Sequence, residues 1–333
     1  MNGTALSLVL VAAVVHAGWN LAAKRVTGGG ARFVFLYYTV SAVVCVPLAV
    51  VALVLEPQRP QWTWLLAAPL TAVFHVLYGV VLQRGYAVGD LSVVYPLARG
   101  SGPLLSVFTA VVLLGERPGV LGLVGAVLIV GGVLLIGTGS GGGPQSDAPD
   151  SGGGGAGRGI ADGTGPDGGM PDGDGDSTGR STPQGTGARP GAGRRRAGVA
   201  YGLLTGLTIA AYTLWDDHSV TALGVPPLVY FSAGALLQSV FLAPIAVRQG
   251  DVRGLWRVHR REILLVGLLS PVAYLLVLYA MRIAPVSLVA PAREVSIVLG
   301  GFAAWLWLGE ANPVRRLVGS LVVLAGIAAI AAS

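Results

Sequence analysis

The chain is dominated by long apolar segments that are separated by short stretches rich in proline, glycine and charged residues. Five such segments precede residue 138, at about 4–23, 31–54, 63–84, 91–114 and 119–137. Five more follow residue 196, at about 197–216, 226–246, 262–282, 286–308 and 314–332. A helix that crosses a bilayer needs about 20 mostly apolar residues. The pattern therefore predicts an all-α membrane protein with ten transmembrane helices.

The composition supports a lipid environment. Hydrophobic residues make up 53% of the chain and charged residues 11%, whereas a soluble domain carries about 25% charged residues. The first apolar segment starts close to Met1 without a preceding basic stretch, so we expect a retained helix rather than a cleaved signal peptide. The net charge of +6 is assigned to loop arginines that set orientation rather than to nucleic-acid binding. We expect a multi-pass protein of the cell (plasma) membrane.

Residues 138–196 differ from the rest of the chain. They contain 21 glycines among 59 positions and have no apolar periodicity. Such a segment cannot bury enough apolar surface to offset the entropy of ordering it, so a disordered linker is predicted. The linker separates two domains, residues 1–137 and 197–333. Cys45 is the only cysteine, which excludes an intramolecular disulfide.

The two domains repeat one another. A shift of 194 residues places Arg99 on Arg293 and Leu114-Gly115-Glu116 on Leu308-Gly309-Glu310. The same shift pairs glycines on the span that follows each motif, Gly125 with Gly319 and Gly132 with Gly326. Because each repeat has an odd number of spans, consecutive repeats enter the membrane from opposite sides. Inverted repeats are a common plan of secondary transporters, whose substrate site lies near the midplane between the halves.

The paired Leu-Gly-Glu motifs, the glycine-rich spans after them, and the segments His16-Ala17-Gly18-Trp19-Asn20 and Tyr95-Pro96-Leu97-Ala98-Arg99-Gly100 resemble the EamA-like drug/metabolite transporter superfamily. The resemblance covers nearly the whole chain outside the linker. It implies two inverted five-helix repeats and a permease activity. Members of the superfamily export amino acids, sugars, nucleotide sugars or drugs, and others take up solutes, so the resemblance leaves the substrate undefined.

Charged residues inside predicted spans mark the candidate site. Arg99 and Arg293 lie deep in the fourth and ninth spans, and Glu294 is the only acidic residue well inside a span. An arginine at a helix centre costs roughly 2.5–3.5 kcal/mol on insertion scales, so a partner or a watery cavity is expected. The functional interpretation makes the arginines binders of an anionic group and Glu294 a proton- or cation-coupling site. The alternative is a set of fixed ion pairs between helices.

Prolines and polar stripes extend the candidate site. Pro96, Pro103, Pro285 and Pro291 lie around the two arginines, and kinked or unwound helix there would expose backbone groups. Polar residues at helical spacing predict cavity-lining faces on other spans. The predicted substrate-binding residues are Arg99, Arg293, Glu294, His16, Asn20, His75 and Tyr274.

Three further expectations concern residues outside the predicted site. Lys24 and Asp216, at span ends, are expected at the membrane interface. Glu116 and Glu310 are expected to favour the N-terminus of the helix that follows each of them. The paired glycines are expected to allow close helix packing.

The leading hypothesis is a secondary transporter of small polar, anionic or zwitterionic metabolites, working by proton coupling or exchange with alternating access. The alternative class is an intramembrane enzyme or lipid-handling protein that uses Glu294 and His75 as acid and base. The sequence shows no phosphate-binding loop, zinc-ligand spacing or nucleophile elbow, which argues against an enzyme and an ATP-driven pump. No cofactor or metal is expected, and the protein is predicted to be a monomer or homodimer.

Membrane orientation receives two opposing predictions. Loops after odd-numbered spans hold 17 of the 20 basic residues outside the spans. The positive-inside rule then places both termini outside and the linker in the cytoplasm. The family resemblance implies that both termini lie inside.

Overall fold

The structure is a computed structural model that describes residues 1–23, 25–26, 29–58, 61–89, 91–137, 191–299 and 313–333. The first repeat contains α1 (Gly3–Ala23), α2 (Gly30–Leu55), α3 (Trp64–Val88), α4 (Leu91–Val112) and α5 (Val120–Gly137). The second contains α6 (Gly191–Val220), α7 (Pro227–Arg248), α8 (Val252–Met281), α9 (Val286–Arg293) and α11 (Pro313–Ala331). The helical core of each predicted segment is confirmed where it is described, and residues 300–308 of the ninth lie outside the described residues.

Two helices of the second repeat begin earlier than the hydrophobic pattern indicates. Helix α6 begins at Gly191 and so includes six residues that the sequence assigns to the linker. Helix α8 begins at Val252, ten residues before the predicted span, where the Asp251 side chain accepts a hydrogen bond from the Gly254 backbone. The backbone of α8 departs from helical angles at His259. Both extensions are rich in arginine, which interrupts the apolar run by which a span is recognised.

Within the described residues, six helices are long and apolar enough to cross a membrane. They are α1, α2, α3, α6, α7 and α8, and shorter apolar helices occupy Val120–Ile136 and Leu317–Ala331. Large apolar side chains also face outward, for example Leu65 (76% exposed), Leu113 (76%) and Val120 (81%). An apolar exterior of this kind fits contact with lipid rather than water. The chain is a multi-pass membrane protein, and the total of ten spans remains a prediction.

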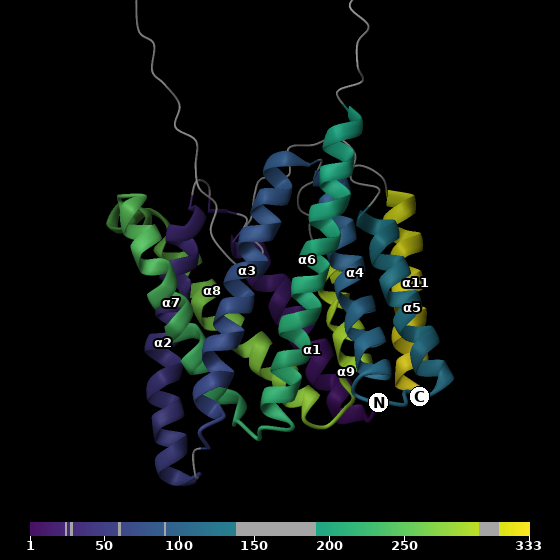
Figure 1. Ribbon diagram of the computed structural model, residues 1–333, viewed down its shortest axis with the longest axis horizontal. Helices are drawn as coiled ribbons and strands as arrows, with labels where there is room; N and C mark the ends of the chain where they lie inside the picture. The colour runs from purple at the N-terminus through teal and green to yellow at the C-terminus, as the bar shows by residue number, and fades with distance from the viewer. Residues whose placement is uncertain (24, 27–28, 59–60, 90, 138–190, 300–312) are drawn as a thin grey trace, which may run out of the picture.

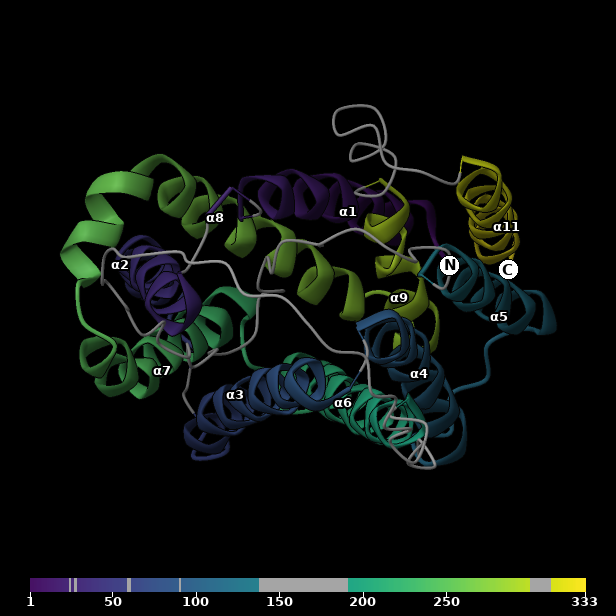
Figure 2. The same cartoon turned by 90° about the horizontal axis from the view of Figure 1, so that it is seen from above.

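Helix packing follows the repeat. The repeat relates each of the helices α1, α2, α3, α4 and α5 to α6, α7, α8, α9 and α11, in that order. When each helix is replaced by its equivalent, one observed pair of neighbours becomes another: α1 with α8 becomes α6 with α3, α1 with α9 becomes α6 with α4, and α2 with α8 becomes α7 with α3. The pairs α2–α7, α4–α9 and α5–α11 map onto themselves. Figure 2 shows α5 with α11 at one edge of the molecule and α2 with α7 toward the other. This exchange is the two-fold relation that a duplicated five-helix unit produces.

The two repeats run in opposite directions. In Figure 1, α6 begins at the end of the molecule opposite to the two termini, whereas α1 begins beside them. The Met1 amino group donates a hydrogen bond to the Ile330 carbonyl at 3.4 Å, so the first and last helices meet at their outer ends. This arrangement is the inverted repeat that the odd number of predicted spans requires.

The described parts of the connections α1–α2, α3–α4 and α7–α8 lie at the end remote from the termini (Figure 1). The Arg32 guanidinium, in the first turn of α2, donates to the Gly250 carbonyl between α7 and α8 at 3.3 Å. Arg194, at the start of α6, donates to the Gly89 carbonyl between α3 and α4 at 3.4 Å. The basic residues of these described segments therefore lie at one end of the protein, as the charge count predicts, whichever side of the membrane that end adopts.

Helices α5 and α11 pack through their paired glycines. A methyl group added at Gly125 would lie 2.6 Å from the Gly326 carbonyl oxygen, and one at Gly132 would lie 2.7 Å from the Gly319 carbonyl oxygen. The reverse additions meet the same partners at 2.7 and 2.9 Å. The predicted close packing at these four positions is confirmed, and it joins the last helix of one repeat to the last helix of the other.

The Leu-Gly-Glu motif of the first repeat acts across the repeats, which corrects the expected role of Glu116. Its Oε1 accepts the backbone N–H of Val286 at 2.9 Å, and its Oε2 accepts that of Ser287 at 3.0 Å. The carboxylate therefore caps the N-terminus of α9 rather than that of α5, the helix that follows it in sequence. A helix N-terminus attracts an anion through its unpaired N–H groups and its dipole. Glu310 lies outside the described residues.

Candidate functional site

A cavity lies between the two repeats, where helices α1–α4 of the first meet α6–α9 of the second. Its lining is mainly aromatic and polar, with two arginines. The residues that line it are Ala12, Ala13, His16, Trp19, Tyr38, Thr71, His75, Tyr78, Arg99, Tyr212, Tyr230, Phe231, Gly234, Gln238, Ser270, Ala273, Tyr274, Val277 and Arg293. A cavity at the repeat interface is the position at which inverted-repeat transporters bind substrate.

The lining itself obeys the repeat. Six lining residues of the first half have a sequence equivalent that lines the same cavity from the second half, with offsets between 193 and 199. The pairs are His16 and Tyr212, Tyr38 and Phe231, Thr71 and Ser270, His75 and Tyr274, Tyr78 and Val277, and Arg99 and Arg293. The cavity is therefore built from equivalent surfaces of the two repeats, although most paired side chains differ.

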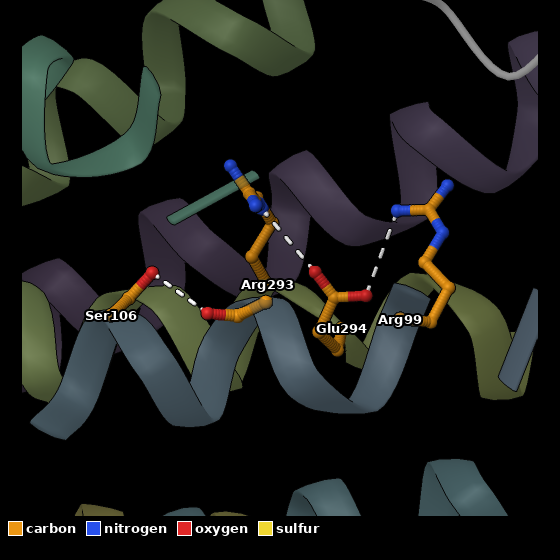
Figure 3. A network of polar contacts seen from close by, with 5 residues as sticks. Arg99, Ser106, Arg293 and Glu294 are labelled. Atoms are coloured by element: carbon orange, nitrogen blue, oxygen red, sulfur yellow. Dashed lines mark hydrogen bonds and ion pairs between the residues drawn. The ribbon is translucent and has the colours of Figure 1, made fainter. Parts of the chain in front are cut away.

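Arg99, Arg293 and Glu294 form a single charged group at this interface (Figure 3). Arg99 Nη1 lies 3.7 Å from Glu294 Oε2, and Arg293 Nε lies 3.6 Å from Glu294 Oε1. Both distances exceed the 2.7–2.9 Å typical of a charge-assisted hydrogen bond. Glu294 Oε2 is buried and has no hydrogen-bond partner among the described residues. The single carboxylate therefore offsets one of the two positive charges without being locked to either guanidinium.

Aromatic rings support both guanidiniums. The Arg99 guanidinium carbon lies 5.9 Å from the centre of the Tyr95 ring, and that of Arg293 lies 5.8 Å from the centre of the Tyr212 ring. A cation over a ring face is attracted to the negative face of the π system. These contacts help to orient the two guanidiniums, which both line the cavity.

The backbones around the two arginines differ between the repeats. Helix α4 stays helical from Leu91 to Val112 although it contains Pro96 and Pro103. Ser106, two turns beyond Arg99 in Figure 3, donates its hydroxyl to the Gly102 carbonyl at 3.0 Å within α4. In the second repeat α9 ends at Arg293, Glu294 is in a turn, and helix resumes at residue 295. The interruption that prolines can cause is thus found in the second repeat, at the charged site.

A second polar group surrounds Asp216 on α6. Thr71 donates to Asp216 Oδ1 at 2.7 Å and Tyr230 donates to the same oxygen at 2.6 Å, while Tyr274 donates to Oδ2. Asp216 is 2% exposed. The expectation that Asp216 lies at the membrane interface is therefore wrong. The reason is that α6 continues to Val220, four residues beyond the predicted span, so Asp216 is enclosed by α3, α7 and α8.

His75 connects this polar group to the cavity. Its Nδ1 lies 2.9 Å from the Thr71 carbonyl oxygen, and its Nε2 lies 3.4 Å from the Tyr274 hydroxyl. Its ring stacks on Tyr212 with a centroid distance of 4.3 Å. The guanidinium of Arg293, a member of the charged group, lies over the same Tyr212 ring. The Tyr212 side chain therefore contacts both the charged group and the polar group around Asp216.

The structure brings together most of the predicted site residues. His16, His75, Arg99, Tyr274 and Arg293 line the cavity, and Glu294 contacts both arginines. Asn20 is not among the lining residues, and the adjacent Trp19 lines the cavity instead. Lys24 lies outside the described residues.

The sequence interpretation missed the role of Asp216 and the contribution of Tyr230. One signal for Asp216 was present, because Trp215-Asp216 aligns with Trp19-Asn20 at an offset of 196. That offset pairs it with a residue already assigned to the cavity. Tyr230 gave no comparable signal, since it starts an apolar helix in which aromatic residues are common.

The pairing required by an acid–base enzyme is not observed. Among the described residues, His75 contacts Thr71, Tyr212 and Tyr274, whereas the charged partners of Glu294 are the two arginines. A catalytic pair needs direct reach or a shared substrate position. The geometry therefore does not favour the enzymatic alternative.

The model of the EamA-like transporter family matches residues 3–138 and 196–332, which are the two repeats and nearly the whole chain. The protein belongs to the EamA-like transporter family. The family resemblance inferred from the paired motifs is thus confirmed, and the two matched segments fit the two-repeat architecture described above.

Structural comparison shows the fold of this EamA-like transporter in a solved protein. A crystal structure described only as "Crystal structure of protein" superposes with a TM-score of 0.69 at 14% sequence identity, over 99% of this chain and 96% of the other. At this identity the likeness concerns the fold alone. No curated protein matches the sequence.

Proposed function

We propose that this EamA-like transporter carries small anionic or zwitterionic metabolites across the plasma membrane, by proton coupling or exchange with alternating access. The observation that carries the proposal is the charged group at the repeat interface. Two arginines that the repeat relates lie on either side of one loosely held carboxylate. Guanidinium groups suit carboxylate or phosphate because their N–H donors form a planar fork.

In this proposal Glu294 occupies the place that a substrate anion takes. The carboxylate offsets one of the two positive charges while no substrate is bound, which limits the energetic penalty of burying the two guanidiniums. An arriving anion competes with Glu294 for Arg99, Arg293 or both. Because Arg99 belongs to α4 and Arg293 to α9, exchanging the bridging anion changes the contact between the repeats, which is the movement that alternating access needs.

The test is flux into liposomes that contain the purified protein. Radiolabelled phosphate, succinate and alanine are supplied singly, with and without an imposed pH gradient, to wild type and to Arg99→Lys and Arg293→Lys. Lysine keeps the charge but loses the fork, so each variant is expected to bind the transported anion about tenfold more weakly, equivalent to about 1.4 kcal/mol. Arg248→Lys, on the exposed end of α7, is the matched control. Wild-type flux of every anion by both site variants would refute the proposed site.

A further inference from the structure

Asp216 is a buried carboxylate whose hydrogen-bond partners are all neutral hydroxyl groups. Thr71, Tyr230 and Tyr274 reach it from three different helices, and within the described part of the chain it forms no ion pair. A charge enclosed in a membrane protein without a counter-ion is costly and marks a functional group. This environment differs from that of Glu294, which lies between two guanidiniums.

The hydroxyls leave one position open on the carboxylate. Two carboxylate oxygens offer about four acceptor sites, and Oδ1 uses two of them for Thr71 and Tyr230. Among the described residues, Oδ2 accepts from Tyr274 alone. A proton that arrives along this hydrogen bond therefore meets no second donor on Oδ2, and the 2% exposure of Asp216 keeps bulk solvent from the carboxylate.

His75 provides a route for that proton from the cavity. Its Nδ1 lies 2.9 Å from the Thr71 carbonyl oxygen, which can only accept a hydrogen bond, so Nδ1 carries the hydrogen of the neutral ring. Nε2 then presents its lone pair toward the Tyr274 hydroxyl at 3.4 Å. Both His75 and Tyr274 line the cavity, so a proton from cavity water can bind Nε2.

The two repeats differ in charge at this position. Asp216 corresponds to Asn20 in the first repeat through the shared Trp-Asn and Trp-Asp pairs. An amide is nearly the same size as a carboxylate but does not bind a proton at neutral pH. The acidic group is therefore present in one repeat only, although the surrounding surface is duplicated. A role in packing alone does not explain a charge at this point.

We propose that Asp216 is the proton-binding site of this transporter, with Tyr274 and His75 as its relay. The Tyr274 hydroxyl proton moves to Asp216 Oδ2, and Tyr274 oxygen takes the proton from the protonated Nε2 of His75, so one proton passes from the imidazolium to the carboxylate. Once Oδ2 carries the proton, the direction of the relay reverses: Oδ2–H donates to the Tyr274 oxygen, and the Tyr274 hydroxyl donates to Nε2 of His75 at the cavity. The inference rests on the proposed transport function, to which it assigns the coupling group.

Several titratable or charged groups surround Asp216 and take part in its electrostatic environment. The elements packed around it contribute Tyr38 from α2, His75 from α3, Arg99 from α4, Tyr212 and Asp217 from α6, Tyr230 from α7, Tyr274 from α8 and Arg293 from α9. Asp217 is also buried, at 8% exposure, but no hydroxyl donates to its side chain among the described contacts. Because a second buried carboxyl directly beside Asp216 can give an infrared band of its own, Asp217 is replaced by asparagine in the background used for the test.

The experiment uses the full chain in lipid vesicles without any substrate. Infrared difference spectra between mildly alkaline and mildly acidic buffer report the C=O stretch of a carboxyl group that gains a proton. We expect such a band in Asp217→Asn, which removes the neighbouring buried carboxyl, its loss in the double variant Asp216→Asn/Asp217→Asn, and its retention in Asp217→Asn/Glu294→Gln. Absence of the band in Asp217→Asn, its persistence in Asp216→Asn/Asp217→Asn, or its loss in Asp217→Asn/Glu294→Gln would overturn the proposal.

Tyr274→Phe keeps the test decisive if Asp216→Asn does not fold. Phenylalanine removes the donor to Oδ2 and preserves the ring, so the carboxyl band should shift in frequency; an unshifted band counts against the site. Since no substrate is used, a failed flux screen leaves this result intact. Conversely, loss of the infrared assignment leaves the arginine site and the transport proposal standing.

Discussion

The two arginines of the site occupy equivalent positions in the repeats, yet each has its own aromatic support and they share one acidic partner. Arg99 lies over Tyr95 of its own helix, and Arg293 lies over Tyr212 of α6. Glu294 follows Arg293 directly in sequence and contacts Arg99 across the interface. The carboxylate thus has one local contact and one contact with the opposite repeat, and only the second is specific to this relative position of the two halves.

Replacing Glu294 by glutamine separates the two interpretations of the charged group. If the carboxylate competes with the transported anion for the arginines, Glu294→Gln removes the competitor. The concentration of anion that gives half-maximal uptake should then fall, by about tenfold for a gain of 1.4 kcal/mol. The measurement is the concentration dependence of uptake in liposomes, compared with wild type.

If the charges are instead fixed ion pairs that hold the helices together, Glu294→Gln should give the opposite result. Removing one partner of a buried ion pair leaves the other charge uncompensated and is strongly destabilising. A Glu294→Gln protein that inserts poorly, or that binds the anion more weakly, would therefore show that the charges hold the repeats together. Asp217→Asn provides the control for removal of a buried carboxylate elsewhere.

At the scale of helices, the capping of α9 by Glu116 links the α4–α5 loop of one repeat to a helix of the other. Both carboxylate oxygens accept backbone N–H groups at 2.9 and 3.0 Å. Glu116→Ala should destabilise the protein by about 0.5–2 kcal/mol, as for loss of a helix cap, and Glu116→Gln by less, since an amide keeps one acceptor oxygen. Thermal unfolding in detergent checks this, and Arg117→Ala on the neighbouring exposed residue should have little effect.

The glycine contact between α5 and α11 gives a second prediction at this scale. Gly125→Ala places a methyl group 2.6 Å from the Gly326 carbonyl, so the two helices must separate. The expected cost is about 1–3 kcal/mol, as for other overpacked positions. Gly131→Ala is the matched control, because nothing lies within 4 Å of its added methyl group and alanine favours a helix. Equal melting temperatures for the two variants would show that the close approach does not contribute to stability.

Most helix positions were predictable because apolar runs report directly on the lipid environment. The predicted spans are too short for α6 and α8, because the ends of these helices carry charged residues and continue beyond the apolar core. Arg99, Arg293 and Glu294 were recognisable because charge is rare inside spans. Asp216 was assigned to the interface because the hydrophobic pattern did not show that α6 continues to Val220. Its three hydroxyl partners lie on other helices, and spacing along the sequence does not reveal such contacts between helices. The contact of Glu116 with the start of α9 could not be predicted for the same reason.

At the scale of the whole molecule, the two repeats contact one another along most of their length through α2–α7, α4–α9 and α5–α11. The glycine-rich composition of the linker predicts no contribution to these contacts. Deletion of residues 140–190, replaced by a short flexible segment long enough to join the ends, should leave insertion and flux at wild-type levels. The deletion stops at residue 190 because α6 begins at Gly191. Normal insertion with lost flux would assign the linker a regulatory role.

The hydrogen bond between Met1 and Ile330 implies that the order of the two repeats along the chain can be exchanged. Since the Met1 nitrogen lies 3.4 Å from the carbonyl oxygen of Ile330, three residues before Ser333, a short peptide can join Ser333 to Met1 while the chain is opened in the linker. Such a circular permutant would begin with the repeat that normally comes second. Its first helix would enter the bilayer from the opposite face, yet every helix pair could form as before. The order of the two repeats in translation is thus separable from the packed state they reach.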